Sequence, residues 1–244
     1  MASGTAVARV LSAPPAVVVG AICVSTPMAA SPSTTADRRG RFIALDGIDG
    51  AGKSSQIAAL VTWLRATGRT VVTCRDPGST PAGDAIRAIL LDRHDLHVDP
   101  TAEMLLYMAA RAQLVAEVVR PALERGDWVV SDRYLLANVV YQVHAGGLDP
   151  EVIRRVGAVA TGGVMPDLVL LLDVDLETAA ARLARPLDKL ENRGDDYRRR
   201  LRQGFLAEAA RDGGTIAVID ATGDMIGVAT RIRAAVTAQF PETG

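Results

Sequence analysis

Hydrophobic residues between positions 41 and 244 follow two alternating patterns. Short apolar runs predict strands, and the longer stretches between them, with apolar residues three and four apart, predict helices. The predicted strands are residues 42–45, 70–74, 128–131, 168–172 and 216–219. Strands that alternate with helices are typical of a parallel sheet with helices on both faces. We therefore expect an α/β fold, a three-layer sandwich around a five-stranded parallel sheet.

The stretches between these strands predict helices of ordinary length, with one longer helix near the middle of the chain. In that long helix we expect Thr101 to cap the N-terminus and Pro121 to introduce a kink, because proline has no N–H to donate. The predicted helices are one that runs from the first strand to about Thr67, then residues 82–91, 101–124, 134–143, 150–160 and 176–183, one that ends at about Ala210, and residues 225–240.

A glycine-rich loop joins the first predicted strand to its helix. Its spacing, Gly-x-x-x-x-Gly-Lys-Ser, is the phosphate-binding loop pattern and is typical of P-loop NTPases. Glycines let backbone N–H groups turn around a phosphate, and the start of a helix adds unpaired N–H groups. We expect Lys53 to add a mobile positive charge and Ser54 to offer a hydroxyl to Mg²⁺. The residues expected to hold ATP are Gly47, Ile48, Asp49, Gly50, Ala51, Gly52, Lys53 and Ser54. The alternative is a glycine-rich turn that binds nothing.

A charged pair, Asp132 and Arg133, stands where the third predicted strand ends. Ligands of open α/β sheets bind beyond the carboxyl ends of the strands. Asp132 can therefore hold Mg²⁺ opposite Ser54, and Arg133 can grip a phosphate with two parallel hydrogen bonds. A purely structural salt bridge between Asp132 and Arg133 is the alternative.

Composition sets limits on the remaining possibilities. The net charge of −1 gives no electrostatic reason to expect a nucleic-acid or membrane partner. Cys23 and Cys74 are far apart and lack metal-site spacing, so a reduced, cytoplasmic protein is the expectation. Residues 1–40 are rich in Ala, Pro, Ser, Thr and Val, and their longest apolar piece, residues 16–24, is too short to span a bilayer. We expect a disordered or mis-started extension at 1–40, which only weakly mimics a secretory signal, followed by one domain at 41–244.

Several short stretches occur in one collinear order. They are residues 46–54, 75–78, 107–111, 132–134 with 141–142, 166–168, 187–191 and 219–222. Together they resemble the thymidylate kinase family over about residues 41–240. The resemblance implies Mg²⁺-dependent transfer of the γ-phosphoryl group from ATP to dTMP, giving dTDP, by a homodimer.

The resemblance also implies a pocket for the acceptor nucleotide. It places Tyr107 against the thymine ring and Arg111 at a carbonyl of that ring, and a spacing of four puts both on one helix face. Asn138 corresponds to a residue that reads the imide edge of the base, and Tyr141 to a ring that crowds the sugar 2′ position, with Gln142 in the same pocket. An ordinary core tyrosine, a surface arginine and a polar helix face remain the alternatives.

Two charged residues are expected near the acceptor sugar and phosphate. Asp49 corresponds to an acidic residue that the family places there, and an anion inside a phosphate loop makes sense if it orients a sugar hydroxyl or an arginine. Arg75, after the second strand, is a candidate contact to the acceptor phosphate. A solvated loop arginine is the alternative for Arg75.

The arginine-rich segment 185–202 corresponds to a lid that closes over ATP. A lid of this kind supplies cations to the transferred phosphoryl group and excludes water. Arg185 and Arg193 are the candidate lid arginines. The segment departs from the family pattern, because Arg185-Pro186 leads directly into Leu187 and shortens the lid, and Ala137 stands where the family usually has a serine. A solvated helical face is the alternative.

The phosphate-loop motif and the resemblance together imply a member of the thymidylate kinase family that uses Lys53, Arg133, Asp49 and the two lid arginines for catalysis. Three alternatives stay open. The chain could phosphorylate another nucleotide or a nucleoside, it could be a catalytically weakened relative that only binds nucleotides, or it could be a P-loop switch that hydrolyses ATP without an acceptor.

Overall fold

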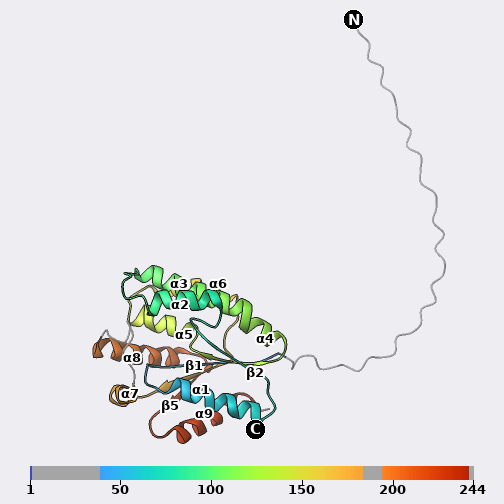
Figure 1. Cartoon of the computed structure of the whole chain (residues 1–244), viewed down its shortest axis with the longest axis vertical. Coiled ribbons are helices and arrows are strands. Elements are labelled where there is room, and N and C mark those ends of the chain that lie inside the picture. The colour runs from blue at the N-terminus through green and yellow to red at the C-terminus, as the bar shows by residue number, and fades with distance from the viewer. Residues whose placement is uncertain (2–38, 184–193, 242–244) are drawn as a thin grey trace, which may run out of the picture. The chain divides into compact units, whose positions relative to one another are not determined.

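A parallel sheet with helices around it is formed by the part of the chain that begins at residue 39 (Figure 1). The structure, a computed structural model, describes residues 1, 39–183 and 194–241. Five strands pair in the order β2-β3-β1-β4-β5, and every pair is parallel. The strands are β1 (Phe42–Asp46), β2 (Val71–Arg75), β3 (Trp128–Asp132), β4 (Leu168–Asp173) and β5 (Ile216–Asp220). The predicted five-stranded parallel sheet is confirmed.

Helices cover both faces of this sheet. In Figure 1, α1 and α9 lie on one face, and α2, α3 and α6 lie on the other. The helices are α1 (Lys53–Ala66), α2 (Pro81–Leu91), α3 (Pro100–Leu114), α4 (Arg120–Glu124), α5 (Leu135–Asn138), α6 (Pro150–Thr161), α7 (Leu176–Arg182), α8 (Asp195–Arg211) and α9 (Met225–Gln239), with π-helical turns η2 (Val115–Val119) and η3 (Val139–His144). The three layers predicted from the alternating pattern are present.

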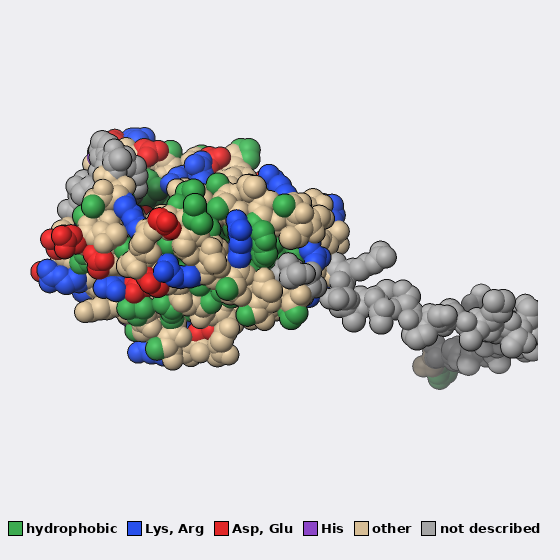
Figure 2. Space-filling view, turned by 90° about the horizontal axis from the view of Figure 1, so that it is seen from below, with side chains coloured by type: hydrophobic (Ala, Val, Ile, Leu, Met, Phe, Trp, Pro, Cys, Tyr) green, Lys and Arg blue, Asp and Glu red, His purple; other side chains and the backbone are tan. Residues whose placement is uncertain are grey.

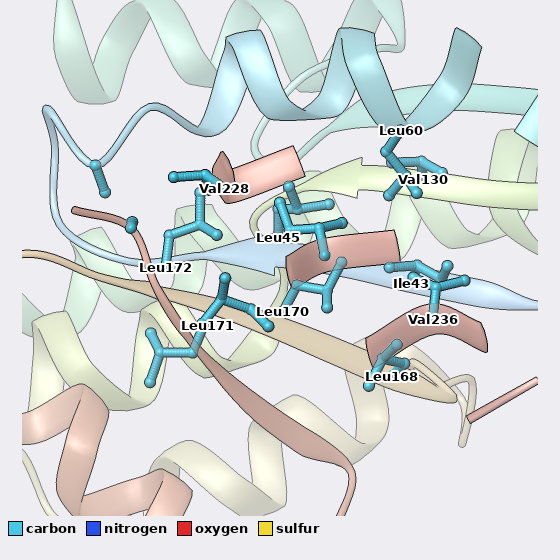
Figure 3. Close-up of a cluster of buried hydrophobic side chains, with 14 of the residues drawn as sticks. Ile43, Leu45, Leu60, Val130, Leu168, Leu170, Leu171, Leu172, Val228 and Val236 are labelled. Atoms are coloured by element: carbon cyan, nitrogen blue, oxygen red, sulfur yellow. The ribbon is translucent and has the colours of Figure 1, made fainter. Parts of the chain in front are cut away.

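The apolar runs of the central strands are explained by burial on both faces. Ile43 and Leu45 of β1 belong to one core cluster, and Phe42 and Ala44 belong to a second. Alternate side chains of a strand point to opposite faces, so β1 has no polar side to expose before Asp46. Figure 3 shows the first cluster, in which side chains of β1, β3 and β4 meet those of α1 and α9. Each fully buried Leu or Ile contributes about 1.5–3 kcal/mol to this core.

The long predicted helix differs from the structure at its start. Asp99, not Thr101, is the N-cap of α3, because the Asp99 side chain accepts a hydrogen bond of 2.8 Å from the Thr101 backbone N–H. Pro100 then occupies the first helical turn, where its missing N–H costs nothing. The prediction of Thr101 as the cap was wrong.

The predicted break near Pro121 takes the form of a π-helical turn. The turn η2 (Val115–Val119) follows α3, and Pro121 lies in the first turn of α4. Because Pro121 has no N–H to donate, the regular hydrogen-bond ladder cannot run through it unchanged. The predicted helix at 134–143 is likewise divided into α5 and the turn η3.

Side chains of both charges are intermixed on the face that carries α1 and α9. Figure 2 shows acidic and basic groups across this face, with hydrophobic side chains spread between them. None of the helices in the described ranges combines the length and the apolar character that crossing a membrane requires. Most of the predicted extension at 1–40, together with Arg185 and Arg193 of the predicted lid, lies outside the described residues.

Candidate active site

A cavity of about 980 Å³ lies beyond the carboxyl ends of the central strands. The ends of β1, β2 and β3 meet there, since Asp132 is the register partner of both Leu45 and Arg75. This edge of an open α/β sheet is where ligands bind. The cavity brings together these predicted residues: Asp49, Gly50, Ala51, Gly52, Lys53, Ser54, Arg75, Tyr107, Arg111, Asp132, Arg133, Asn138, Tyr141 and Gln142.

The glycine loop is shaped by left-handed backbone positions. Gly50 has φ 87° and Gly52 has φ 92°, a region that residues with a Cβ rarely adopt. Gly52 is the N-cap of α1, and no side chain of the described residues caps this helix. The first turn of α1 also carries no acidic residue. Its unpaired N–H groups and positive dipole end are therefore available to an anion.

Gly50 has a packing role that Gly52 lacks. A Cβ built at Gly50 would lie 2.1 Å from the backbone oxygen of Ala179, whereas one built at Gly52 meets nothing within 4 Å. We expect Gly52→Ala to lower the free energy of unfolding by about 1 kcal/mol through backbone strain, and Gly50→Ala by about 3 kcal/mol because α7 must also move. Urea unfolding of both variants without nucleotide measures the difference, and equal losses would contradict this packing.

Lys53 is held by the loop that it follows. Its Nζ donates to the carbonyl oxygens of Gly47 and Ile48 at 3.0 Å each, and to Oδ1 of Asp49 at 3.3 Å. Lys53 is 8% exposed, and burial lowers its pKa, as does the nearby charge of Arg133. Gly47 and Ile48 do not line the cavity themselves; their carbonyl groups fix the lysine behind it.

Arg133 connects the end of β3 with the phosphate loop. Its Nη1 donates to Oδ1 of Asp46 at 3.1 Å and to the Gly47 oxygen at 3.0 Å, and its Nη2 donates to Oδ1 of Asp49 at 2.7 Å. The guanidinium also lies 5.2 Å from the ring centroid of Tyr141. The backbone φ of Arg133 is 67°, and its N–H donates to the Leu45 oxygen at 2.9 Å, which turns the side chain toward the loop.

Asp49 is the carboxylate that both cations share. Burial alone would raise its pKa, but Arg133 and Lys53 together hold the pKa of this carboxyl well below its usual range. The hydroxyl of Tyr141 donates to Asp49 Oδ2 at 3.2 Å. Asp49 thus accepts a hydrogen bond from an arginine, Arg133, and its expected role near the acceptor sugar and phosphate stays a prediction.

Two buried aspartates were missed by the sequence prediction: Asp76, which lines the cavity, and Asp46, which does not. Asp46 is fully buried, and burial raises its pKa to about 6, although Arg133 and Lys53 act in the opposite direction. Asp76 accepts a hydrogen bond of 2.6 Å from Nε of Arg111, and the side chains of both are almost completely buried. Burial also raises the pKa of Asp76, while Arg111 lowers it. The available signal was their position, each immediately at or after the end of a strand.

Another part of the cavity, called the second pocket below, is lined by polar side chains from α3 and from α5 with the turn η3. Arg111 of α3 donates through Nη2 to Oδ1 of Asn138, and Nδ2 of Asn138 donates to Gln142 Oε1 at 2.9 Å. Asn138 and Gln142 are each 3% exposed. Tyr107, one turn before Arg111, lines the same part of the cavity. These side chains form a connected wall rather than a solvated helix face.

Two arginines from β2 and α2, Arg75 and Arg87, also line the cavity. Arg75 lines the cavity but is mostly exposed, and its Nη2 donates to Oδ1 of Asp84 at 2.9 Å. Arg87 of α2 also lines the cavity and donates to the Pro77 oxygen at 3.0 Å. Arg87 was missed, and its only sequence signal was a basic residue on the helix that follows the 75–78 stretch.

The opposite end of the cavity is formed by the loop before α9. Nη1 and Nη2 of Arg182 each donate at 2.9 Å, to the oxygens of Ala221 and Gly223 respectively. Nε2 of Gln56 donates to the Met225 oxygen at 3.0 Å. Neither contact was predicted, because each depends on segments that are distant in the sequence.

The residues expected to bind Mg²⁺ fit a hard divalent cation. Ser54 and Asp132 both line the cavity beside the loop. Oδ1 of Asp132 is buried and has no hydrogen-bond partner within residues 39–183 and 194–241. Mg²⁺ prefers oxygen ligands and usually takes one or two from the protein, with phosphates and water supplying the rest. An orphaned carboxylate oxygen, in a cavity that a serine hydroxyl also lines, is consistent with that chemistry.

The fold and this site define a class of protein. A strand, glycine loop, lysine and helix in this order form a P-loop nucleotide site. A second polar pocket in the same cavity distinguishes a P-loop kinase from a P-loop protein that handles a single nucleotide.

Comparisons with known proteins give the family. A family model described as thymidylate kinase matches residues 45–232. A thymidylate kinase of Rhodopirellula baltica is 48% identical over 195 residues, covering 80% of this chain and 79% of that protein. One of Bifidobacterium longum is 45% identical over 186 residues, covering 75% and 90%. The crystal structure of thymidylate kinase from Ehrlichia chaffeensis shares the fold with a TM-score of 0.66 at 24% identity, covering 81% of this chain and 99% of that one. The chain belongs to the thymidylate kinase family.

Proposed function

We propose that this chain transfers the γ-phosphoryl group of ATP to dTMP, giving dTDP, with the help of Mg²⁺. The observation that carries the proposal is the continuity of the cavity, which runs from Lys53 in the phosphate loop to Tyr107 and Arg111 in the second pocket. A switch that hydrolyses ATP has no use for a second pocket with its own buried arginine. Membership of the thymidylate kinase family supports the same conclusion.

Catalysis in this proposal is placement of charge around the transferred group. The acceptor phosphate is already an anion, so no covalent intermediate is needed and cations at the shifting charge lower the barrier. Lys53 and the N–H groups of the loop bind the donor phosphates, while Arg133 binds between donor and acceptor. Mg²⁺, held by Ser54 and Asp132, would neutralise charge on the phosphate oxygens. Arg185 and Arg193 are proposed to add cations from the lid.

When nucleotide phosphates bind, Lys53 and Arg133 must give up some of their present hydrogen bonds to protein groups. Lys53 donates to two loop carbonyls, and Arg133 donates to Asp46 and Asp49. We propose that phosphate oxygens replace some of these partners, and that Asp49 keeps Arg133 oriented during the exchange.

The acceptor nucleotide is proposed to lie in the second pocket. Tyr107 stacks on the base, and Arg111, Asn138 and Gln142 meet its polar edge. Tyr141 lies against the sugar. Arg75 provides a cation for the acceptor phosphate, with Arg87 as a second candidate from the same side of the cavity.

The direct test compares phosphoryl transfer to dTMP with plain hydrolysis of ATP. We expect transfer to dTMP to exceed hydrolysis by at least a hundredfold, to stop when EDTA removes Mg²⁺, and to return when Mg²⁺ is restored. A panel of dTMP, dUMP, dCMP, dGMP and thymidine should give the highest kcat/KM for dTMP. Preference for another acceptor would assign the chain to a different kinase activity. Hydrolysis without transfer would identify a switch, and binding without turnover a weakened relative.

Tyr107→Ala tests the base pocket alone. We expect the KM for dTMP to rise about tenfold, because one base-stacking surface is worth about 1–3 kcal/mol, while the KM for ATP stays within twofold. Leu105→Ala is the matched control, since Leu105 lies on the same helix but is 50% exposed and does not line the cavity. Equal increases for both substrates would place the base elsewhere.

We also propose that the protein acts as a cytoplasmic homodimer. Its substrates and Mg²⁺ are found in the cytoplasm, and Val152 and Val159 of α6 leave 44% and 83% of their surface exposed, as residues in a subunit contact would. Light scattering in solution should give twice the chain mass of 25.7 kDa. A mass of one chain would contradict the dimer.

A further inference from the structure

The wall of the second pocket is one chain of hydrogen bonds with a carboxylate at each end. Arg111 donates through Nε to Asp76 at 2.6 Å and through Nη2 to Oδ1 of Asn138. Asn138 donates through Nδ2 to Oε1 of Gln142 at 2.9 Å. Gln142 donates through Nε2 to Oε1 of Glu103 at 3.2 Å. Glu103 lies one turn before Tyr107 on α3 but does not line the cavity.

The donor-to-acceptor direction of this series of hydrogen bonds is determined by the groups at both of its ends. The oxygen and nitrogen of a side-chain amide have similar shapes, so the partners decide which way it points. An ionised carboxylate only accepts, so Gln142 must present its NH₂ to Glu103 and its oxygen to Asn138. A guanidinium only donates, so Asn138 must present its oxygen to Arg111. Both ends therefore require the same orientation of the two amides.

This orientation determines which base edge the pocket matches. Oδ1 of Asn138 lies beside the guanidinium of Arg111, and a carbonyl oxygen has a second lone pair to offer. The wall thus presents an N–H donor next to an oxygen acceptor. A pyrimidine with a 4-carbonyl and an N3–H is complementary to that pair. A pyrimidine with a 4-amino group and an unprotonated N3 has both polarities reversed.

We propose that Glu103 is a positioning residue that secures base discrimination by holding the amides of Gln142 and Asn138 in this orientation. The inference rests on the proposed function, because it assumes that the base lies against this wall. Glu103 touches no substrate; it acts through Gln142. Its spacing from Tyr107 and Arg111 places all three on one face of α3.

Two substitutions at Glu103 test whether this residue fixes the orientation of the Gln142 and Asn138 amides. In Glu103→Gln the new amide can donate or accept, so only the Arg111 end still imposes a direction. In Glu103→Lys the new side chain only donates, so it opposes the Nε2 group of Gln142. The measured quantity is the ratio of kcat/KM for dTMP to kcat/KM for 5-methyl-dCMP, which differ only at positions 3 and 4 of the ring. We expect this ratio to fall about threefold in Glu103→Gln and at least tenfold in Glu103→Lys.

Comparing the KM for dTMP with the KM for ATP distinguishes a positioning role of Glu103 from a general disturbance of the fold. The change should come from the KM for dTMP, with the KM for ATP within twofold of the unmodified protein. Glu117→Gln and Glu117→Lys are the matched controls, because Glu117 also accepts a hydrogen bond from a glutamine, Gln113, but is exposed on the turn that follows α3. They should leave the ratio unchanged.

An unchanged ratio in Glu103→Gln would overturn the inference, and this variant decides the matter if Glu103→Lys does not fold. An equal loss toward dTMP and ATP would overturn it too, since that pattern indicates a structural role. Failure of the unmodified protein to phosphorylate dTMP is a different outcome, and it would refute the proposed function itself.

Discussion

Replacing Lys53 with alanine is expected to lower kcat for phosphoryl transfer by about a thousandfold, because preorganised charge at the reacting phosphate is a large part of catalysis in this class of enzyme. The fold should survive. Lys53 is a buried cation whose pKa is lowered by burial, so the folded state gains little from its charge. Its removal leaves Asp49 paired with Arg133 at 2.7 Å. We expect the free energy of unfolding to change by less than about 2 kcal/mol.

Steady-state kinetics and urea unfolding of the same Lys53→Ala preparation separate the two effects. Arg93→Ala is the control for loss of a cation, since Arg93 is 54% exposed and pairs with Asp95, which is also exposed. That variant should retain full activity. Normal turnover in Lys53→Ala would place the donor phosphates away from the loop.

Arg133→Lys is expected to lower kcat/KM for dTMP by about a hundredfold. The substitution keeps the charge but removes the planar fork that reaches Asp46 and Asp49 at the same time. Asp46 is fully buried, and Arg133 is the largest influence that counters the effect of burial on its pKa. We therefore also expect a loss of about 1–3 kcal/mol in the free energy of unfolding.

Arg202→Lys is the matched control for this substitution. Arg202 makes a two-pronged contact with Asp173 at the end of β4, at 2.7 and 2.8 Å, but does not line the cavity. It should lose stability without a change in the KM for dTMP. If both variants changed the kinetics alike, Arg133 would be a structural residue rather than a substrate contact.

The fold could be predicted from local patterns of apolar and polar residues, because these patterns directly reflect which side chains are buried. The run 168–172 predicted a central strand, and β4 lies between β1 and β5 with these residues buried. The prediction of Thr101 as the N-cap of α3 was wrong because Asp99, two residues earlier, also has a side chain that can cap a helix. The choice depended on Pro100, which fits the first helical turn and so makes the preceding residue the cap.

The site could be predicted where one short motif holds the chemistry. The phosphate loop and the pair Asp132–Arg133 each lie within a few residues, and the cavity brings them together. Asp46 and Asp76 were missed because their role depends on arginines 87 and 35 residues away. A buried carboxylate gains a function from its partner, and a single sequence does not show which distant arginine will meet it.

The buried pairs explain how the two arginines stay ordered without substrate. Arg111 is held by Asp76, which follows β2, and Arg133 is held by Asp46, which ends β1; these two strands flank β3. An arginine fixed in advance loses less side-chain entropy when a ligand arrives, which strengthens binding. We expect the base pocket and the phosphate contact to be preformed to this extent.

In the proposed function, two nucleotides meet across the glycine loop, with Arg133 between their phosphates. The most direct measurement is a crystal structure with dTMP and a non-hydrolysable ATP analogue bound together. We expect the thymine ring on Tyr107 with its polar edge at Arg111. We also expect the guanidinium of Arg133 and Nζ of Lys53 within about 3.5 Å of phosphate oxygens, the limit of a hydrogen bond. Phosphates bound elsewhere, with Arg133 still directed at Asp46 and Asp49 and no base beside Tyr107, would contradict the proposed function.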